Sequence, residues 1–167
     1  MTVSVYDEDD GLASALEGVA DALGADGVQS EPAGPEALQF TIAGDWTELS
    51  GLVASHPEVS ALVFSLALDI EVAAAHVARV RELLSLVNER LWLGHLDLWP
   101  NEDTIVFRHT LLIPGREQAS DEEISMSLAA GVSAMDRLFP ALKLVIEDGA
   151  GPEAALASCL FETDGEA

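Results

Sequence analysis

The side chains best suited to chemistry in this chain lie close together, between Asn88 and His109, in the stretch NERLWLGHLDLWPNEDTIVFRH. His95 and Asp97 are separated by one residue, so a β-strand would place both on the same face. An imidazole beside a carboxylate can orient a catalytic base or help to hold a metal ion. Arg108 adds a cation that could bind a carboxylate or a phosphate group. This stretch is therefore a candidate for an active site or a metal site.

The other parts of a catalytic centre are missing from the sequence. A hydrolytic triad needs a nucleophile, but no Gly-x-Ser-x-Gly motif occurs, and Cys159, the single cysteine, has no predicted place beside His95. A metal site built on His95 and Asp97 would need a third ligand, whereas His109 is expected on the opposite face of the sheet. No glycine-rich phosphate-binding loop is present either. We therefore expect no catalytic residues, no metal, no cofactor and no enzymatic activity.

Apolar and polar residues alternate in the same stretch, which predicts a β-hairpin of strands 91–99 and 104–113 joined by a turn. The register that buries the apolar side of both strands pairs Leu98 with Ile105, and it packs that side under a helix predicted over 70–90. The expected core of the hairpin consists of Trp92, Leu98, Ile105 and the pair Leu96 and Phe107.

The same register gathers polar side chains on the other face of the hairpin, with His95 opposite Arg108 and Asp97 opposite Val106. One interpretation is a cross-strand polar cluster with a purely structural role. The other is a surface that contacts a partner protein, flanked by apolar side chains. The residues of that surface would be Leu93, His95, Asp97, Trp99 and Arg108.

Helical and strand periodicities continue along the rest of the chain. They predict helices near 9–24, 70–90 and 120–139 and strands near 27–31, 37–43 and 59–67. Ser120 and Glu123 have the spacing of a capping box at the start of the third helix, and Pro140 is expected to end or kink it. PALKLVI could form a further helical piece or a strand, and a helix is favoured; a terminal helix is expected from Pro152, while 44–58 is ambiguous. No linker or repeat divides the chain, so one domain over 1–167 is expected.

The net charge of −23 is distributed unevenly, because all seven Lys and Arg residues follow residue 78. Such a surface repels phosphate backbones and anionic lipid, so we expect no nucleic-acid or membrane binding. No apolar run is long enough for a membrane span, and the N-terminus does not resemble a secretory signal, so a cytoplasmic protein is expected. The acidity either promotes solubility, as in a salt- or acid-adapted proteome, or steers a basic partner protein.

The run LLSLVNERLWLGHLDLWPNEDTIVFRHTLLIPG resembles the bacterial YbjN-like family, as do the later segments FPALKLVI, GPEAALA and FETDGEA. This resemblance implies an α+β fold like that of type III secretion chaperones, with the order helix, three strands, helix, two strands, helix and a mainly antiparallel sheet. The family is described as regulators of sensory transduction, linked to stress and surface behaviours. It has no established catalytic residues, so the resemblance transfers none to this chain.

Two functions from different classes follow. The first is a non-enzymatic, protein-binding regulator or chaperone-like adaptor of bacterial stress or sensory signalling. The alternative is a small-ligand-binding protein or enzyme with a polar pocket around His95, Asp97 and Arg108. A homodimer is also expected, because Leu93, Trp99 and Val106 would be costly to leave in water on an uncovered sheet face.

Overall fold

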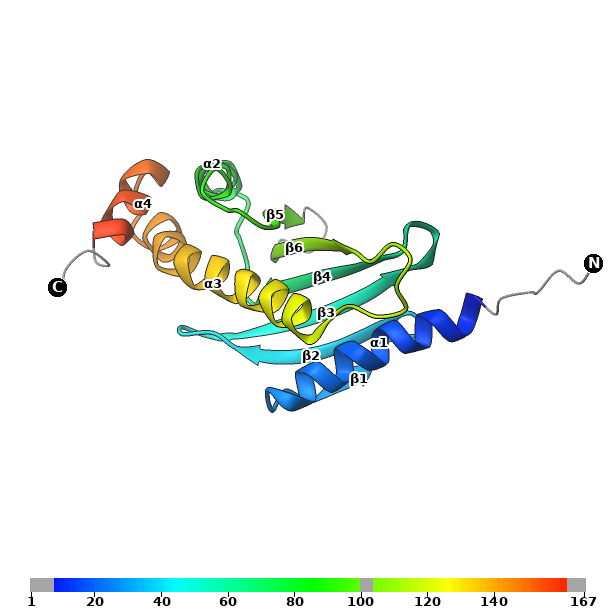
Figure 1. The fold of residues 1–167 in the computed structure, drawn as a ribbon. Coiled ribbons are helices and arrows are strands. Elements are labelled where there is room, and N and C mark those ends of the chain that lie inside the picture. The colour runs from blue at the N-terminus through cyan, green and yellow to red at the C-terminus, as the bar shows by residue number, and fades with distance from the viewer. Residues whose placement is uncertain (1–7, 100–103, 162–167) are drawn as a thin grey trace, which may run out of the picture.

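The computed structural model describes residues 8–99 and 104–161, which contain four α-helices, six strands and a short 3-10 helix (Pro57–Val59) (Figure 1). The helices are α1 (Glu8–Ala25), α2 (Val77–Asn88), α3 (Asp121–Ile146) and α4 (Pro152–Phe161). The strands are β1 (Ser30–Pro32), β2 (Ala37–Ala43), β3 (Glu48–His56), β4 (Ala61–Leu68), β5 (His95–Trp99) and β6 (Thr104–Leu112). The predicted α+β class is confirmed, with one strand more than the sequence indicated.

The six strands form one antiparallel sheet in the order β1-β2-β3-β4-β6-β5. The first four strands follow one another as a meander. The chain then passes through α2 before β5 and β6 complete the sheet, with β6 paired to β4 and β5 left at the edge. The predicted hairpin therefore lies at one side of the sheet, and β1 lies at the other.

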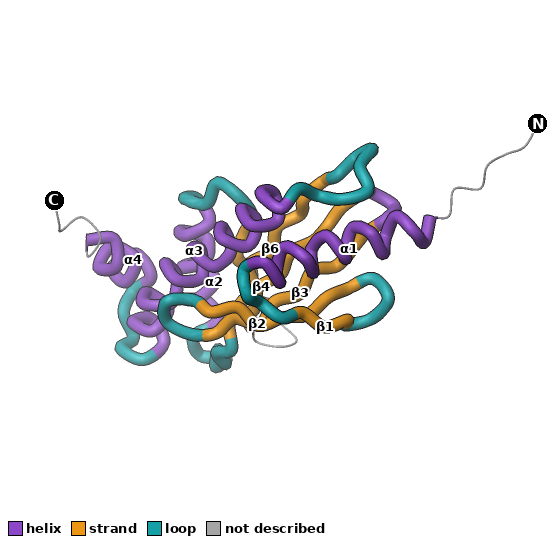
Figure 2. Tube along the Cα trace, turned by 60° about the horizontal axis from the view of Figure 1, so that its bottom comes forward, coloured by secondary structure: helices purple, strands orange, loops and turns teal. Residues whose placement is uncertain are grey.

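One face of the sheet carries the hydrophobic core. In β3 the residues Leu49, Gly51, Val53 and Ser55 are buried, and exposed or half-buried residues alternate with them. Helix α1 contacts β3, α3 contacts β4 and β6, and α2 contacts β5. Figures 1 and 2 show α1 and α3 running along the sheet, with α1 and α4 at opposite ends of the molecule. We call this side of the sheet the helical face.

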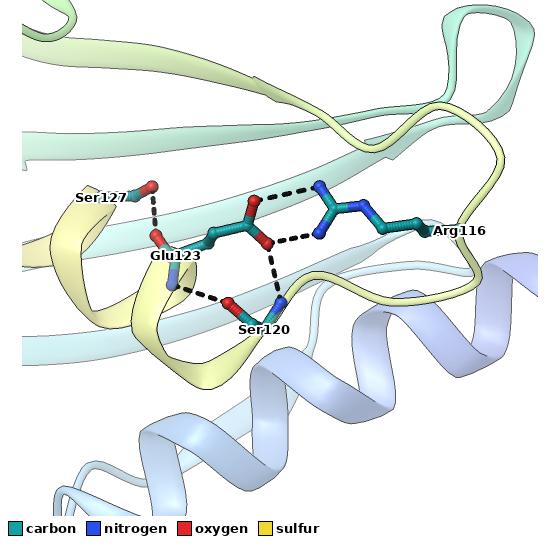
Figure 3. A network of polar contacts seen from close by, with 4 residues as sticks. All are labelled: Arg116, Ser120, Glu123 and Ser127. Carbon is teal, nitrogen blue, oxygen red and sulfur yellow. Dashed lines mark hydrogen bonds and ion pairs between the residues drawn. The ribbon is translucent and has the colours of Figure 1, made fainter.

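The N-terminus of α3 is held by the polar network of Figure 3. The Ser120 hydroxyl accepts the Glu123 backbone N–H, and the Glu123 carboxylate accepts the Ser120 backbone N–H at 2.9 Å, so the predicted capping box is confirmed. Both carboxylate oxygens of Glu123 also bind the guanidinium of Arg116, at 2.7 and 3.0 Å. Nearby, the Gln118 amide donates to the hydroxyl and carbonyl oxygens of Ser14. The loop between β6 and α3 is thereby tied to both α3 and α1.

Helix α3 continues through Pro140 to Ile146, so Pro140 does not end the helix, which overturns the first of the two alternatives predicted for it; the helical assignment of PALKLVI is confirmed. Proline removes one backbone donor from a helix interior, which normally weakens it. Here the last turns bury Ala141, Leu142 and Val145 almost completely. Burial of these side chains offsets the lost hydrogen bond, because packing against the core supplies most of the stability of such a helix.

The predicted register of the hairpin is confirmed, with Leu96 paired to Phe107 and Leu98 to Ile105, all four deeply buried. The placement of Trp92 in the core is wrong, because its side chain is fully exposed. The cause is the backbone conformation of Gly94, two residues further along the chain.

Strand β5 begins only at His95, because Gly94 turns the chain with a φ of +68°. A side chain at Gly94 would also overlap the Phe107 ring. The residues before Gly94 therefore leave the sheet, and Trp92 points into solvent.

Two other segments differ from the sequence interpretation. The ambiguous region 44–58 contains β3, a central strand of the sheet. Helix α2 begins at Val77 rather than near residue 70. The preceding residues, 69–76, form a connection without helix in which Val72 is buried.

Candidate functional site: the open face of the sheet

The side of the sheet opposite the helical face is called the open face here, because none of the described helices packs against it. Its side chains come from the residues that alternate with the core positions of β2 to β6. The pairing aligns one row of them across five strands. That row consists of Gln39, Leu52, Ser65, Arg108 and His95. Residues from strands far apart in the sequence thus form one continuous surface on the open face.

A shallow hollow of about 660 Å³ lies on the open face. It forms because β4 contributes the short side chains of Ser65 and Ala67 between larger residues on either side. Leu52 lines it from β3, and Trp99 from β5. Its rim is polar, with Glu31, Gln39, Thr41 and Ser50 among the lining residues. Such a mixture of apolar floor and polar rim is typical of protein-binding surfaces.

The structure places the predicted partner-binding residues on or beside this face. His95 lies directly opposite Arg108, as the register predicted. Trp99 lines the hollow, whereas His95, Asp97 and Arg108 do not. Leu93 lies in the loop before β5 and is more than one third exposed.

The polar residues of this group do not converge into a reactive centre. The Asp97 carboxylate accepts the backbone N–H of Leu98 at 2.8 Å. Within the described part of the chain, the ion pairs are Arg116–Glu123 and Lys143–Glu147, so Arg108 and Asp97 form none. The structure therefore does not bring the side chains of His95, Asp97 and Arg108 together in a pocket.

Val106, expected as an exposed apolar residue of this face, is only 2% exposed. It lies between β4 and β5, opposite Ala67 and Asp97, so its neighbours in the sheet cover it. Exposed apolar area on the face comes instead from Leu52 and Leu112. Leu52 was not among the predicted site residues because 44–58 was ambiguous, since Gly51 and Ser55 interrupt the apolar alternation of its strand.

His109 faces the helical side, as the sequence predicted, and its ring stacks on Phe64 with centroids 6.4 Å apart. Burial lowers the pKa of the His109 imidazole below its usual 6.5, so the ring is neutral at pH 7. Among the described residues, no group of three or more His, Cys, Asp or Glu side chains is arranged to hold a metal ion. In the same residues no helix is both long and apolar enough to cross a membrane.

Asn88 fixes the loop that leads into this face. Its side-chain amide donates to the Leu96 carbonyl at 3.0 Å, and its side-chain oxygen accepts the Leu96 N–H at 2.8 Å. These two bonds join the end of α2 to the free edge of β5. The short loop between them, which carries Trp92 and Leu93, is held at both ends.

Comparison with known proteins agrees with this architecture. The YbjN family, described as "Putative bacterial sensory transduction regulator", matches residues 13–144. A crystal structure of "YbjN, a putative transcription regulator from E. coli" is similar, with a TM-score of 0.53 and 15% sequence identity over 74% of this chain and 87% of that chain. The ExsC–ExsE complex is similar with a TM-score of 0.49 and 15% identity over 74% of this chain and 92% of that chain.

At such low identity the YbjN structure shows a common fold and nothing finer. No curated protein sequence matches the chain significantly. The family match, however, extends over most of the chain and includes the hairpin, the open face and α3. The chain belongs to the YbjN family.

Proposed function

We propose that this chain is a non-enzymatic regulator in bacterial sensory or stress signalling, and that it acts by binding a partner protein on the open face. One observation carries the proposal: a six-stranded sheet is covered by helices on one side and presents a hollow between Leu52 and Trp99 on the other. Uncovered sheet faces with apolar side chains are unusual unless something binds there. The description of the family as sensory regulators supports the same function.

The proposed contact surface consists of Leu93, His95, Asp97, Trp99 and Arg108 together with Leu52 at the far side of the hollow. Trp99 and Arg108 are of the residue types that most often dominate binding energy at protein interfaces. His95 and Asp97 supply polar contacts at the edge strand. A surface that spans several strands suits a protein segment better than a compact substrate, because the hollow is wide and shallow.

The charge of the chain favours a partner with basic segments. At −23 per chain, long-range attraction speeds the approach of a cationic protein and slows that of an acidic one. The same charge makes nucleic acid and anionic membranes poor partners. We further propose that the protein is cytoplasmic and that it forms a homodimer.

Blocking the hollow tests this function. Ser50 is exposed and lines the hollow, so Ser50→Arg introduces a long cationic side chain into it without disturbing the core. Ser85→Arg on the exposed side of α2 is the matched control, with the same change in residue type and charge. Affinity capture from the native cell, read by mass spectrometry, should recover a partner with the wild type and the control and lose it with Ser50→Arg. Identical capture by all three proteins would refute the open face as the binding surface.

A further inference from the structure

A second cleft lies on the other side of the molecule, away from the open face, where α2, α3 and α4 meet the turn between β2 and β3. Its volume is about 700 Å³, which is within the usual range for small-molecule sites. We propose that this cleft binds an amphipathic carboxylate, a ligand with an apolar aliphatic body and one anionic end. The inference is independent of the open face, because the two sites share no lining residue.

The outer wall of the cleft is a rigid turn. Trp46 is 59% exposed, yet its ring stacks on Phe139 of α3 with centroids 6.2 Å apart and planes 14° from parallel. The adjacent Asp45 N–H donates to the Asp136 carboxylate at 2.8 Å. Gly44 lets this carboxylate approach, since a Cβ there would lie 2.7 Å from the Asp136 Oδ1. Because the ring stacking and this hydrogen bond both hold the turn against α3, the Trp46 ring is a positioned part of the cleft wall.

The floor of the cleft suits an aliphatic body. Val87 and Leu91 line it from the end of α2 and the residues just after it, Val132 and Pro140 from α3, and Leu156 from α4. Three helices thus contribute apolar side chains to one concave surface. An aliphatic chain bound there would bury both the apolar surface of the cleft and the surface of the chain itself away from water.

The anionic end of the ligand is specified by Arg90 and Arg137, which both line the cleft. The chain has thirty acidic and only seven basic residues, so most cations should find a carboxylate nearby. Yet the ion pairs in the described residues are Arg116–Glu123 and Lys143–Glu147, and neither cleft arginine takes part in one.

Among the described residues, both cleft arginines keep donors available for a ligand. Arg90 donates one bond to the Leu86 carbonyl at 3.1 Å, which leaves most of its N–H groups available. Asp45 and Asp136 also line the cleft, and Asp136 Oδ1 accepts the Asp45 N–H, but among the described residues neither carboxylate forms an ion pair with a cleft arginine. Each guanidinium therefore presents planar donors of the kind that match a carboxylate.

Decanoate is a suitable probe, and Trp46 reports on it directly. In the variant Trp92→Phe/Trp99→Phe, Trp46 is the single tryptophan, so its fluorescence follows occupancy of the cleft. We expect a saturable change with decanoate. Decanol and decylamine, which carry the same chain without the anion, should bind at least about tenfold more weakly, because they lack the charge-assisted bonds to arginine.

Three further variants isolate the site. Arg90→Gln/Arg137→Gln should weaken decanoate binding about tenfold or more, whereas Arg79→Gln/Arg81→Gln, which removes the same charge from exposed positions outside the cleft, should leave it unchanged. Ala129 is exposed and lines the cleft, so Ala129→Phe should block binding while both arginines stay in place. Circular dichroism confirms that each variant is folded. The proposal is overturned if decanoate produces no saturable change, if decanol binds as tightly, or if the two arginine double variants behave alike.

Discussion

The side chain of Asn88 forms two hydrogen bonds with the backbone of a single residue, Leu96, one to its carbonyl and one from its N–H. Asn88 is the last residue of α2, and Leu96 lies in the edge strand β5. The amide therefore acts as a short substitute for a neighbouring strand at the free edge of the sheet, and it sets the position of the loop that carries Trp92 and Leu93.

Removing this amide should loosen β5. Asn88→Ala leaves the N–H and carbonyl of Leu96 without their partner, and each lost bond of this kind costs about 1 kcal/mol, so the free energy of unfolding should fall by about 1–3 kcal/mol. Ser85→Ala, one turn earlier on the exposed side of α2, is the control and should change it by less than about 0.5 kcal/mol. Equal values for the two variants in chemical denaturation would show that the clamp does not contribute to stability.

The aromatic residues of the hairpin should differ sharply in their contribution to stability. Phe107 is completely buried, so Phe107→Ala should lower the free energy of unfolding by about 3–5 kcal/mol. Trp92 is fully exposed, so Trp92→Ala should change it by no more than about 0.5 kcal/mol. Urea denaturation of both variants measures the difference. A large loss with Trp92→Ala would contradict the position of that side chain in solvent.

Gly94 and Gly115 have nearly the same φ, +68° and +69°, in different surroundings. A Cβ at Gly94 would overlap the Phe107 ring, whereas a Cβ at Gly115 would meet open space. Both alanine variants carry the backbone strain, about 1–3 kcal/mol, but only Gly94→Ala adds the steric clash. Thermal unfolding should therefore show a clearly lower Tm for Gly94→Ala than for Gly115→Ala. Similar Tm values would mean that the ring can move aside at no cost.

The bonds that Glu123 accepts from Arg116 and Ser120 should make stability depend on pH. They lower the pKa of the Glu123 carboxyl to about 2, with the Arg116 hydrogen bonds as the largest cause. Since this pKa is below the ordinary 4.5 of the unfolded chain, the carboxylate stabilises the folded state fully above pH 4.5, and this contribution is lost as pH falls from there toward 2.

The variant Glu123→Gln should therefore lose stability at neutral pH and converge on the wild type as the pH approaches 2. Glu122→Gln, an exposed neighbour without the Arg116 contact, is the control and should keep the pH dependence of the wild type. Denaturant titrations at a series of pH values give the comparison. A constant difference between Glu123→Gln and the wild type across this range would exclude the proposed linkage.

Self-association should follow from the open face. Leu52, Leu112 and Leu93 expose apolar area there that a second copy could cover in competition with the partner protein, and two-fold dimers are the commonest solution. The charge of −23 opposes pairing, but salt screens it within about 8 Å at physiological ionic strength, so the dimer should weaken as salt is removed. Light scattering across protein and salt concentrations measures the mass. The mass of one chain at high protein and high salt concentration would rule the dimer out.

The features that the sequence alone determined are those set by near neighbours in the chain. The pairing of Leu98 with Ile105 follows from alternation within one hairpin, where a shift by one residue would turn every apolar side chain to the wrong face. The capping box of Ser120 and Glu123 depends on a spacing of three residues. The opposite orientations of His95 and His109 follow from the same alternation.

Strand β3 shows what the local sequence does not reveal. Its buried side includes Gly51 and Ser55, which are weak signals for a strand. Gly51 occurs there because the ring of Phe40, on the neighbouring strand, fills the space where its side chain would lie. Because the need for glycine at this position comes from Phe40 on another strand, the residue pattern within 44–58 does not reveal it.

The position of the candidate sites was decided by tertiary packing. Both sides of β4 are largely apolar, so alternation states which residues share a face but not which face the helices cover. Helix α3 continues past Pro140, against the local propensity of proline, and Phe139 stacks on Trp46, a contact between segments nearly a hundred residues apart. Local sequence predicts neither arrangement. They form because burying α1, α2 and α3 on one side of the sheet removes more apolar surface from water than any locally preferred alternative, and that gain depends on residues distant in the sequence.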